Sequence, residues 1–150
     1  MMRLAFGAAF IATAAFAGDF KATCPVSGQK AKEENKVEKD GKTVYFCCEN
    51  CPKKYEENAK KYTAQANYQL FETHQLVQKA CPFSGQPVNA DTKTKIGKGD
   101  VEVAFCCEKC QGKVKEADPK KQVELVFKDV KKGFEPAKKK EAEKKDGSRG

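Results

Sequence analysis

The cysteines are the residues of this chain whose type and spacing best suit chemistry. Eight are present, in two sets of four: Cys24, Cys47, Cys48 and Cys51, then Cys81, Cys106, Cys107 and Cys110. In each set one distant cysteine precedes a Cys-Cys-Glu-x-Cys cluster, with 22 intervening residues in the first set and 24 in the second. Close sulfur pairs joined by a distant sulfur are typical of thiolate metal sites, and the ions that suit them are Zn²⁺ or Cu⁺.

The two cysteine sets belong to an internal repeat. Residues 24–29 (Cys-Pro-Val-Ser-Gly-Gln) recur as residues 81–86 (Cys-Pro-Phe-Ser-Gly-Gln), an offset of 57. Residues 46–51 (Phe-Cys-Cys-Glu-Asn-Cys) recur as residues 105–110 (Phe-Cys-Cys-Glu-Lys-Cys), an offset of 59. All eight cysteines lie in these four blocks, so the chain contains two copies of one small cysteine module.

Each copy has the same expected order of elements. A glycine turn signal precedes a short strand of β-branched and aromatic residues, predicted over residues 43–46 and 101–105. Each strand runs into the cysteine cluster. A helix should follow over residues 51–62, with Asn50 as its N-cap, and over residues 110–117 in the second copy.

The second helix should stop at Asp118-Pro119, and each copy should end in strand-like stretches. We expect these stretches at residues 66–71 with 76–79, and at residues 123–127. The expected fold class is therefore α+β, with two small tandem treble-clef or zinc-knuckle-like modules, each a β-hairpin followed by a helix.

The spacing favours three thiolates and one open position per ion, with about one ion in each module. Residues at i and i+4 across a helix start share a face, and the helix N-terminus favours the thiolate form. Adjacent Cys47 and Cys48 point in different directions, so they should not bind one ion together. Either Cys47 or Cys48 can therefore join Cys51 and Cys24, and the second set offers the same choice.

The sequence around the cysteine clusters resembles the TRASH and YHS families of small metal-binding domains. Residues 44–51 (Val-Tyr-Phe-Cys-Cys-Glu-Asn-Cys), followed by Lys53-Lys54-Tyr55 and Lys61-Tyr62, are similar to the strand, cysteine pair and helix of a YHS module. The resemblance covers about residues 23–62 and 80–120. It implies a treble-clef-like fold and roles in heavy-metal sensing, trafficking or resistance, with copper, zinc or similar soft ions.

The chain departs from that family in the opening turn. Ser27 and Ser84 occupy the position of the family's cysteine, and the cysteine stands at the front of the turn instead. The family's methionine, a ligand suited to Cu⁺, is replaced by Gln29 and Gln86.

The N-terminus predicts export. Arg3 gives a positive start, residues 4–16 carry no charge, and Ala15-Phe16-Ala17 fits a signal-peptide cleavage site. The apolar run is too short to span a bilayer, so no transmembrane segment should remain after cleavage. We expect a periplasmic or secreted protein: residues 1–17 as signal peptide, 18–79 as the first module with its linker, 80–130 as the second module, and 131–150 as a lysine-rich disordered tail.

The other residues of the chain argue against specific nucleic-acid binding and against enzymatic activity. The chain has 29 basic and 21 acidic residues, a formal charge of +8, but its only arginines are Arg3 and Arg149. Lysine cannot make the bidentate contacts that read bases, so specific nucleic-acid binding is not expected. Ser27 and Ser84 have no acid or base nearby in sequence and read as turn residues, and the single histidine, His74, reads as a surface residue of the linker. A non-enzymatic protein is expected.

Two readings compete with a metal site. An exported chain with an even number of cysteines also fits a disulfide framework. The Cys48-x-x-Cys51 and Cys107-x-x-Cys110 pairs also fit a thiol–disulfide redox protein, although the expected thioredoxin-like βαβ pattern is missing. Within the metal reading, a structural zinc and a transport or sensing role remain equally open.

Overall fold

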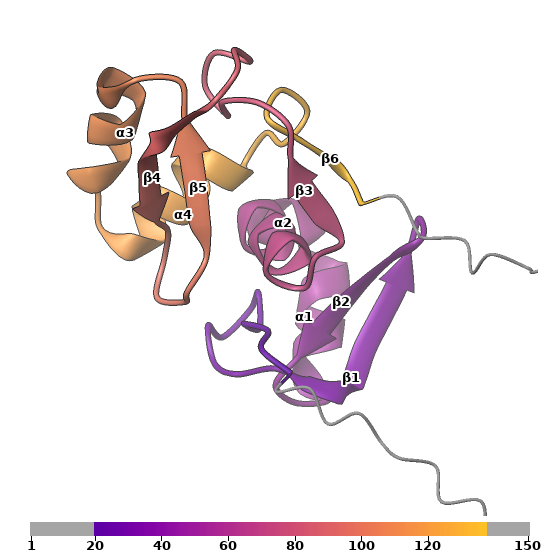
Figure 1. Cartoon of the computed structure of the whole chain (residues 1–150). Coiled ribbons are helices and arrows are strands. Elements are labelled where there is room, and N and C mark those ends of the chain that lie inside the picture. Colours follow the sequence, from indigo (N-terminus) through magenta and orange to yellow (C-terminus); the bar gives the residue numbers. More distant parts are fainter. Residues whose placement is uncertain (1–19, 138–150) are drawn as a thin grey trace, which may run out of the picture.

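In the computed structural model, which describes residues 20–137, each repeat contributes one β-hairpin (Figure 1). In the first hairpin, β1 (Lys32–Lys39) pairs antiparallel with β2 (Lys42–Phe46). The two linking residues, Asp40 and Gly41, have φ of 53° and 71°, as a two-residue hairpin turn of type I′ requires. The second hairpin pairs β4 (Asn89–Lys95) with β5 (Glu102–Phe105) through a longer loop.

Helical segments follow each hairpin directly. The described residues contain four α-helices and one 3-10 helix, with these bounds: α1 (Asn50–Glu57), η1 (Ala59–Tyr62), α2 (Thr63–Glu72), α3 (Glu108–Lys115) and α4 (Pro119–Phe127). None of these helices is long and apolar enough to cross a membrane. The expected α+β class, with a hairpin followed by a helix in each module, is confirmed.

The first predicted helix begins slightly earlier than expected and is divided into α1 and η1. Asn50 is its first helical residue and not its N-cap; the capping position is held by Glu49, whose side chain makes no capping hydrogen bond. The helix start is instead fixed by the turn before it, because the Cys51 N–H donates to the Cys48 carbonyl.

The strands predicted over residues 66–71 and 123–127 are wrong, because both segments are helical. The helix predicted to stop at Asp118 ends earlier, since the last residue of α3 is Lys115. The Asp118 carboxylate instead accepts hydrogen bonds from the N–H groups of Lys120 and Lys121, which starts α4 with Pro119 in its first turn. In α2, Ala64 and Tyr68 stand four residues apart and are both buried in the second core. Helical periodicity therefore outweighs the apolar run that suggested a strand.

The last element of each repeat is a three-residue strand, and the two strands pair with each other. β3 (Leu76–Gln78), predicted within residues 76–79, is antiparallel to β6 (Phe134–Pro136), with Val77 opposite Glu135. The disorder expected from residue 131 is therefore wrong for this segment, in which Phe134 is buried. The predicted signal peptide and residues 138–150 of the predicted tail lie outside the described residues, so both stay predictions.

The two repeats pack through matching elements. Besides the β3–β6 pair, α2 lies against α4, where the rings of Phe71 and Phe127 are 5.7 Å apart between centroids. Each repeat thus presents its second helix and its final strand to the other, which is the arrangement of an approximate two-fold axis. Figure 1 shows α2 between the two hairpins.

Two small cores result, one for each module. Phe46 and Phe105, the residues that precede the cysteine clusters, are fully buried in them. Tyr55 and Tyr62 are only half-buried. Helix α2 serves both cores, with Leu70 in the first and Tyr68 in the second.

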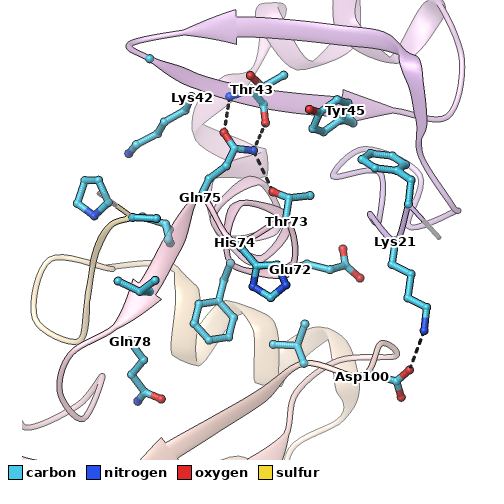
Figure 2. A pocket seen from close by; sticks show the side chains of 18 of the residues that line it. Lys21, Lys42, Thr43, Tyr45, Glu72, Thr73, His74, Gln75, Gln78 and Asp100 are labelled. Atoms are coloured by element: carbon cyan, nitrogen blue, oxygen red, sulfur yellow. Dashed lines mark hydrogen bonds and ion pairs between the residues drawn. The ribbon is translucent and has the colours of Figure 1, made fainter. Parts of the chain in front are cut away.

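Glutamine side chains cover the outer edges of the strands that lead to the cysteines. The carboxamide of Gln75 accepts from the Thr43 N–H and donates to the Thr43 carbonyl, both at 2.7 Å (Figure 2). Gln69 makes the same pair of bonds with Tyr45, and Gln78 makes it with Ala104. Backbone groups that a third strand would otherwise satisfy are thus paired, which fixes β2 and β5 against the centre of the molecule.

Gly133 provides a test of how closely the segment before β6 packs against residues 79–82. Its carbonyl accepts from the N–H groups of Lys79 and Ala80, and a Cβ at this position would lie 2.7 Å from the Pro82 Cα. Because the obstructing atom is backbone, we expect Gly133→Ala to lower the free energy of unfolding of the apoprotein by about 1–3 kcal/mol in urea titrations.

The matched control is Gly112→Ala in α3, where a Cβ meets nothing within 4 Å. This change should leave the protein as stable or raise its free energy of unfolding by about 0.5–1 kcal/mol, since alanine is the better helix former. Equal stability of the two variants would contradict the close docking of Gly133 on the second module.

Candidate metal centre

A tight turn places the first cysteine of each module. The Cys24 N–H donates to the Gln29 carbonyl at 2.7 Å, and the Gly28 N–H donates to the Cys24 carbonyl at 2.8 Å. Gly28 has φ of +72°, a left-handed conformation that glycine adopts without strain. The turn at Cys81 has the same two bonds at 2.8 and 2.9 Å, which explains why both copies carry Cys-Pro-x-Ser-Gly.

A strand-to-helix corner places the other cysteines. Strand β2 ends at buried Phe46, Cys47 and Cys48 lie in the bend, and Cys51 lies in the first turn of α1. In the second module β5, the bend and α3 place Cys106, Cys107 and Cys110 in the same way. The hairpin brings this corner back to the opening turn, so cysteines that are distant in sequence meet.

Three sulfur atoms converge in each module. Cys24, Cys47 and Cys51 have Sγ atoms that all lie within 4.8 Å of one another, and we call them the first triad; Cys81, Cys106 and Cys110 form the second triad in the same way. The Cys47–Cys51 and Cys106–Cys110 Sγ separations are 3.6 and 3.7 Å. Two thiolates bound tetrahedrally at a Zn–S distance near 2.3 Å stand about 3.8 Å apart, so both clusters are close enough to hold a metal ion.

Cys48 and Cys107 lie beside the triads and are not members of them. Both are exposed. The Cys48 Sγ is 3.8 Å from the Cys47 Sγ and 3.4 Å from the Cys51 Sγ. Of the two ligand choices that the sequence leaves open, the structure therefore groups Cys47, and not Cys48, with the distant cysteine.

The opening serines contact the sulfur atoms. The Ser27 Oγ lies 3.1 Å from the Cys47 Sγ and accepts from the Gln29 N–H, and the Ser84 hydroxyl donates to the Cys106 Sγ at 3.2 Å. Both serines are turn residues, as expected, but their contacts with sulfur were not predicted from the sequence. The signal available in the sequence is that Ser27 and Ser84 recur at the same position of the two opening turns.

Hydrogen bonds favour the thiolate at the buried cysteine of each turn. Cys24 and Cys81 are 1% and 0% exposed. Burial acts to raise the pKa of the Cys81 thiol, but hydrogen bonds from the Ser84 hydroxyl and from the N–H groups of Ser84, Cys106 and Phe83 outweigh it and lower the pKa to about 6. The pKa of Cys24 is lowered in the same manner.

In each triad the pKa of the helix cysteine, Cys51 or Cys110, is raised instead of lowered. Burial, together with hydrogen bonds to the neighbouring thiols, raises the pKa of Cys110 to about 12, and burial likewise raises the pKa of Cys51 far above its ordinary value. In each triad a helix thiol with a raised pKa thus lies beside a turn thiol with a lowered pKa. A bound cation would displace the proton of the helix thiol, which is how thiol sites couple metal binding to proton release.

All eight cysteines are free thiols in the structure. The other predicted residues of interest lie elsewhere. His74 is exposed and holds the left-handed position that follows α2, with φ of 58°. Among the described residues, the two triads are the groups of histidine, cysteine or acidic side chains that converge closely enough to hold a metal ion.

Comparison with known proteins adds no name to this geometry. No protein-family model, no curated protein and no solved structure matches the chain. The chemistry of the site therefore follows from its own residues.

The serine contact predicts a shift in thiol ionisation. The Ser84 hydroxyl, which lies 3.2 Å from the Cys106 Sγ, also lowers the Cys81 pKa. Ser84→Ala removes this hydroxyl, and a hydrogen bond to a charged group is worth enough to raise the Cys81 pKa by about one unit. Because a higher pKa means less thiolate at a given pH, the ultraviolet thiolate absorbance of the reduced apoprotein should rise at higher pH in the variant than in the wild type, over the range above pH 6.

Thr63→Ala is the control for this titration, since the Thr63 hydroxyl donates to the carbonyls of Ala59 and Lys60 and not to sulfur. Its titration should overlay that of the wild type. Identical curves for Ser84→Ala and the wild type would show that the hydroxyl has no effect on the thiolate.

Proposed function

We propose that this chain is an exported protein that binds soft or borderline heavy-metal ions, Zn²⁺ or Cu⁺, through cysteine thiolates, with one ion in each module. Its cellular role would be metal trafficking, sensing or resistance, as the resemblance to TRASH and YHS domains suggests. It would act as a non-enzymatic carrier or sensor. Export is supported by the signal-peptide pattern of residues 1–17.

The observation that carries this proposal is the convergence of three sulfur atoms in each module. The triad donors are all thiols, the ligands preferred by Zn²⁺ and Cu⁺ over the harder cations Mg²⁺ and Ca²⁺. One sulfur of each triad is fully buried and held by N–H groups of its own turn, so it is oriented before an ion arrives. This preorganisation occurs in both modules, and it indicates metal binding more specifically than the number of cysteines does.

The three-sulfur arrangement also favours a carrier or sensor role over a purely structural zinc site. A structural zinc site is closed by four protein ligands, whereas three sulfur atoms leave a position open. An open position lets a further donor approach the ion, which a carrier or sensor needs. Exposed thiols next to each triad leave this side of the site accessible to solvent.

Ion counting tests the proposal. Native mass spectrometry of the reduced chain 18–150, offered Zn²⁺ and then Cu⁺, should show two ions per chain. Cys51→Ser should bind one ion and Cys51→Ser/Cys110→Ser should bind none, because a triad that loses one of its three thiols keeps only two sulfur ligands. In the single variant, the ion retained by the second module reports that the chain is still folded.

His74→Ala is the control and should retain two ions, since His74 belongs to neither triad. A reduced wild-type chain that binds neither ion would overturn the proposed function. Oxidation of all eight cysteines in the exported protein, with no metal bound, would favour a disulfide framework instead.

One observation favours a second candidate, thiol–disulfide exchange. Exposed Cys48 lies 3.4 Å from Cys51 at the start of α1, and hydrogen bonds from the Cys51 thiol and from the N–H groups of Asn50 and Cys51 lower its pKa. Its thiolate could attack a substrate disulfide, and Cys51 could then displace the mixed disulfide, giving a Cys48–Cys51 disulfide and two substrate thiols. Insulin reduction above the dithiothreitol background, lost in Cys48→Ser/Cys107→Ser, would support this candidate; background rates in the wild type would exclude it.

A further inference from the structure

We propose that Cys48 and Cys107 are transfer ligands: each takes over the ion from the buried turn cysteine of its module and presents it to an acceptor at the surface. This inference rests on the proposed metal-binding function and adds to it a route by which the ion leaves. The acceptor is a molecule that offers its own thiolate or chelating donors to a soft ion.

This inference rests on the observation that each cluster contains two overlapping sets of three sulfur atoms. The first triad joins Cys47 and Cys51 to Cys24. The same two cysteines form an outer set with Cys48, in which the three Sγ separations are 3.8, 3.6 and 3.4 Å. The outer set has the spacing that one thiolate-bound ion requires, about 3.8 Å or slightly less, and the Sγ atoms of the first triad all lie within 4.8 Å of one another. An ion can therefore pass from one set to the other by exchanging a single ligand.

The two sets differ in their access to solvent. Cys24 is 1% exposed and lies at the inner end, Cys47 is half-buried, and Cys48 is exposed. In the second module Cys81 is 0% exposed, Cys106 is half-buried, and Cys107 is exposed. The sulfur atoms thus form a graded path from the interior to the surface in both copies.

The second module repeats the arrangement with different neighbours. The Cys106 Sγ is 3.7 Å from both the Cys107 Sγ and the Cys110 Sγ, and the Cys107 and Cys110 thiols also interact. The residue after the shared Glu differs, Asn50 in one copy and Lys109 in the other. The adjacent cysteine pair is therefore a feature that both corners keep, although each triad is complete without its exposed member.

The exchange balances without oxidation. As the ion moves outward, its bond to the Cys48 sulfur forms and its bond to the Cys24 sulfur breaks. The Cys48 thiol gives its proton to water, and Cys24 remains as a thiolate that accepts from the N–H groups of Val26, Ser27 and Cys47. The ion keeps three sulfur ligands before and after the step, so it is never released bare into solvent.

The test measures transfer separately from binding. The chain 18–150, loaded with Zn²⁺ at both sites, is mixed with the chromogenic chelator 4-(2-pyridylazo)resorcinol, and the coloured zinc complex is followed in stopped flow. Cys48→Ser/Cys107→Ser should still bind two ions with wild-type affinity but should release them about tenfold more slowly, since a small rise in barrier has this effect. The control Glu49→Gln/Glu108→Gln changes exposed residues that lie next to the same cysteines and should transfer at the wild-type rate.

The other outcomes overturn the inference in distinguishable ways. A tenfold or larger loss of affinity in Cys48→Ser/Cys107→Ser would make these cysteines resident ligands of a four-sulfur site. Unchanged transfer rates would show that the ion leaves without them. A wild-type chain that binds no Zn²⁺ would fail the proposed function itself and not only this addition to it.

Discussion

The arrangement of this molecule depends on holding three sulfur atoms within the reach of one ion when two of them stand more than 20 residues from the third. In each module a fully buried phenylalanine, Phe46 or Phe105, stands directly before the cysteine corner. That ring fixes the end of the strand, and the helix start then fixes the cysteine four residues after the first of the pair. The opening turn completes the set, because its hydrogen bonds orient the buried sulfur towards the corner.

The pairing of the two repeats explains how such small modules become stable. A single two-stranded hairpin is marginal in water, and it needs further strands or a helix against it. Here α2 supplies side chains to both cores, and glutamines of α2 and β3 pair with the free edges of β2 and β5. The final strand of each repeat pairs with that of the other. Each site is therefore supported by elements that belong to both repeats.

The sequence predicts the local parts of this structure well and the shared parts poorly. The hairpins and turns are encoded by local signals such as Asp40-Gly41 and Cys-Pro-x-Ser-Gly, and the helices after the cysteine clusters begin within two residues of their predicted starts. The strand predicted over residues 66–71 is helical because the buried residues of α2 serve two cores, which disguises the usual one-sided pattern. The β3–β6 pairing is a contact between residues about 58 positions apart, and no local signal marks Phe134 as part of a sheet.

At the candidate site, the sequence identifies the cysteines but cannot choose between adjacent ones, since Cys47 and Cys48 differ only in which way the bend turns them. X-ray absorption at the zinc edge of the loaded chain tests the central claim most directly. The account predicts a shell of three sulfur atoms at about 2.3 Å with one lighter donor in the open position. A shell dominated by nitrogen or oxygen, or one of four sulfur atoms in the wild type, would contradict binding by the two triads.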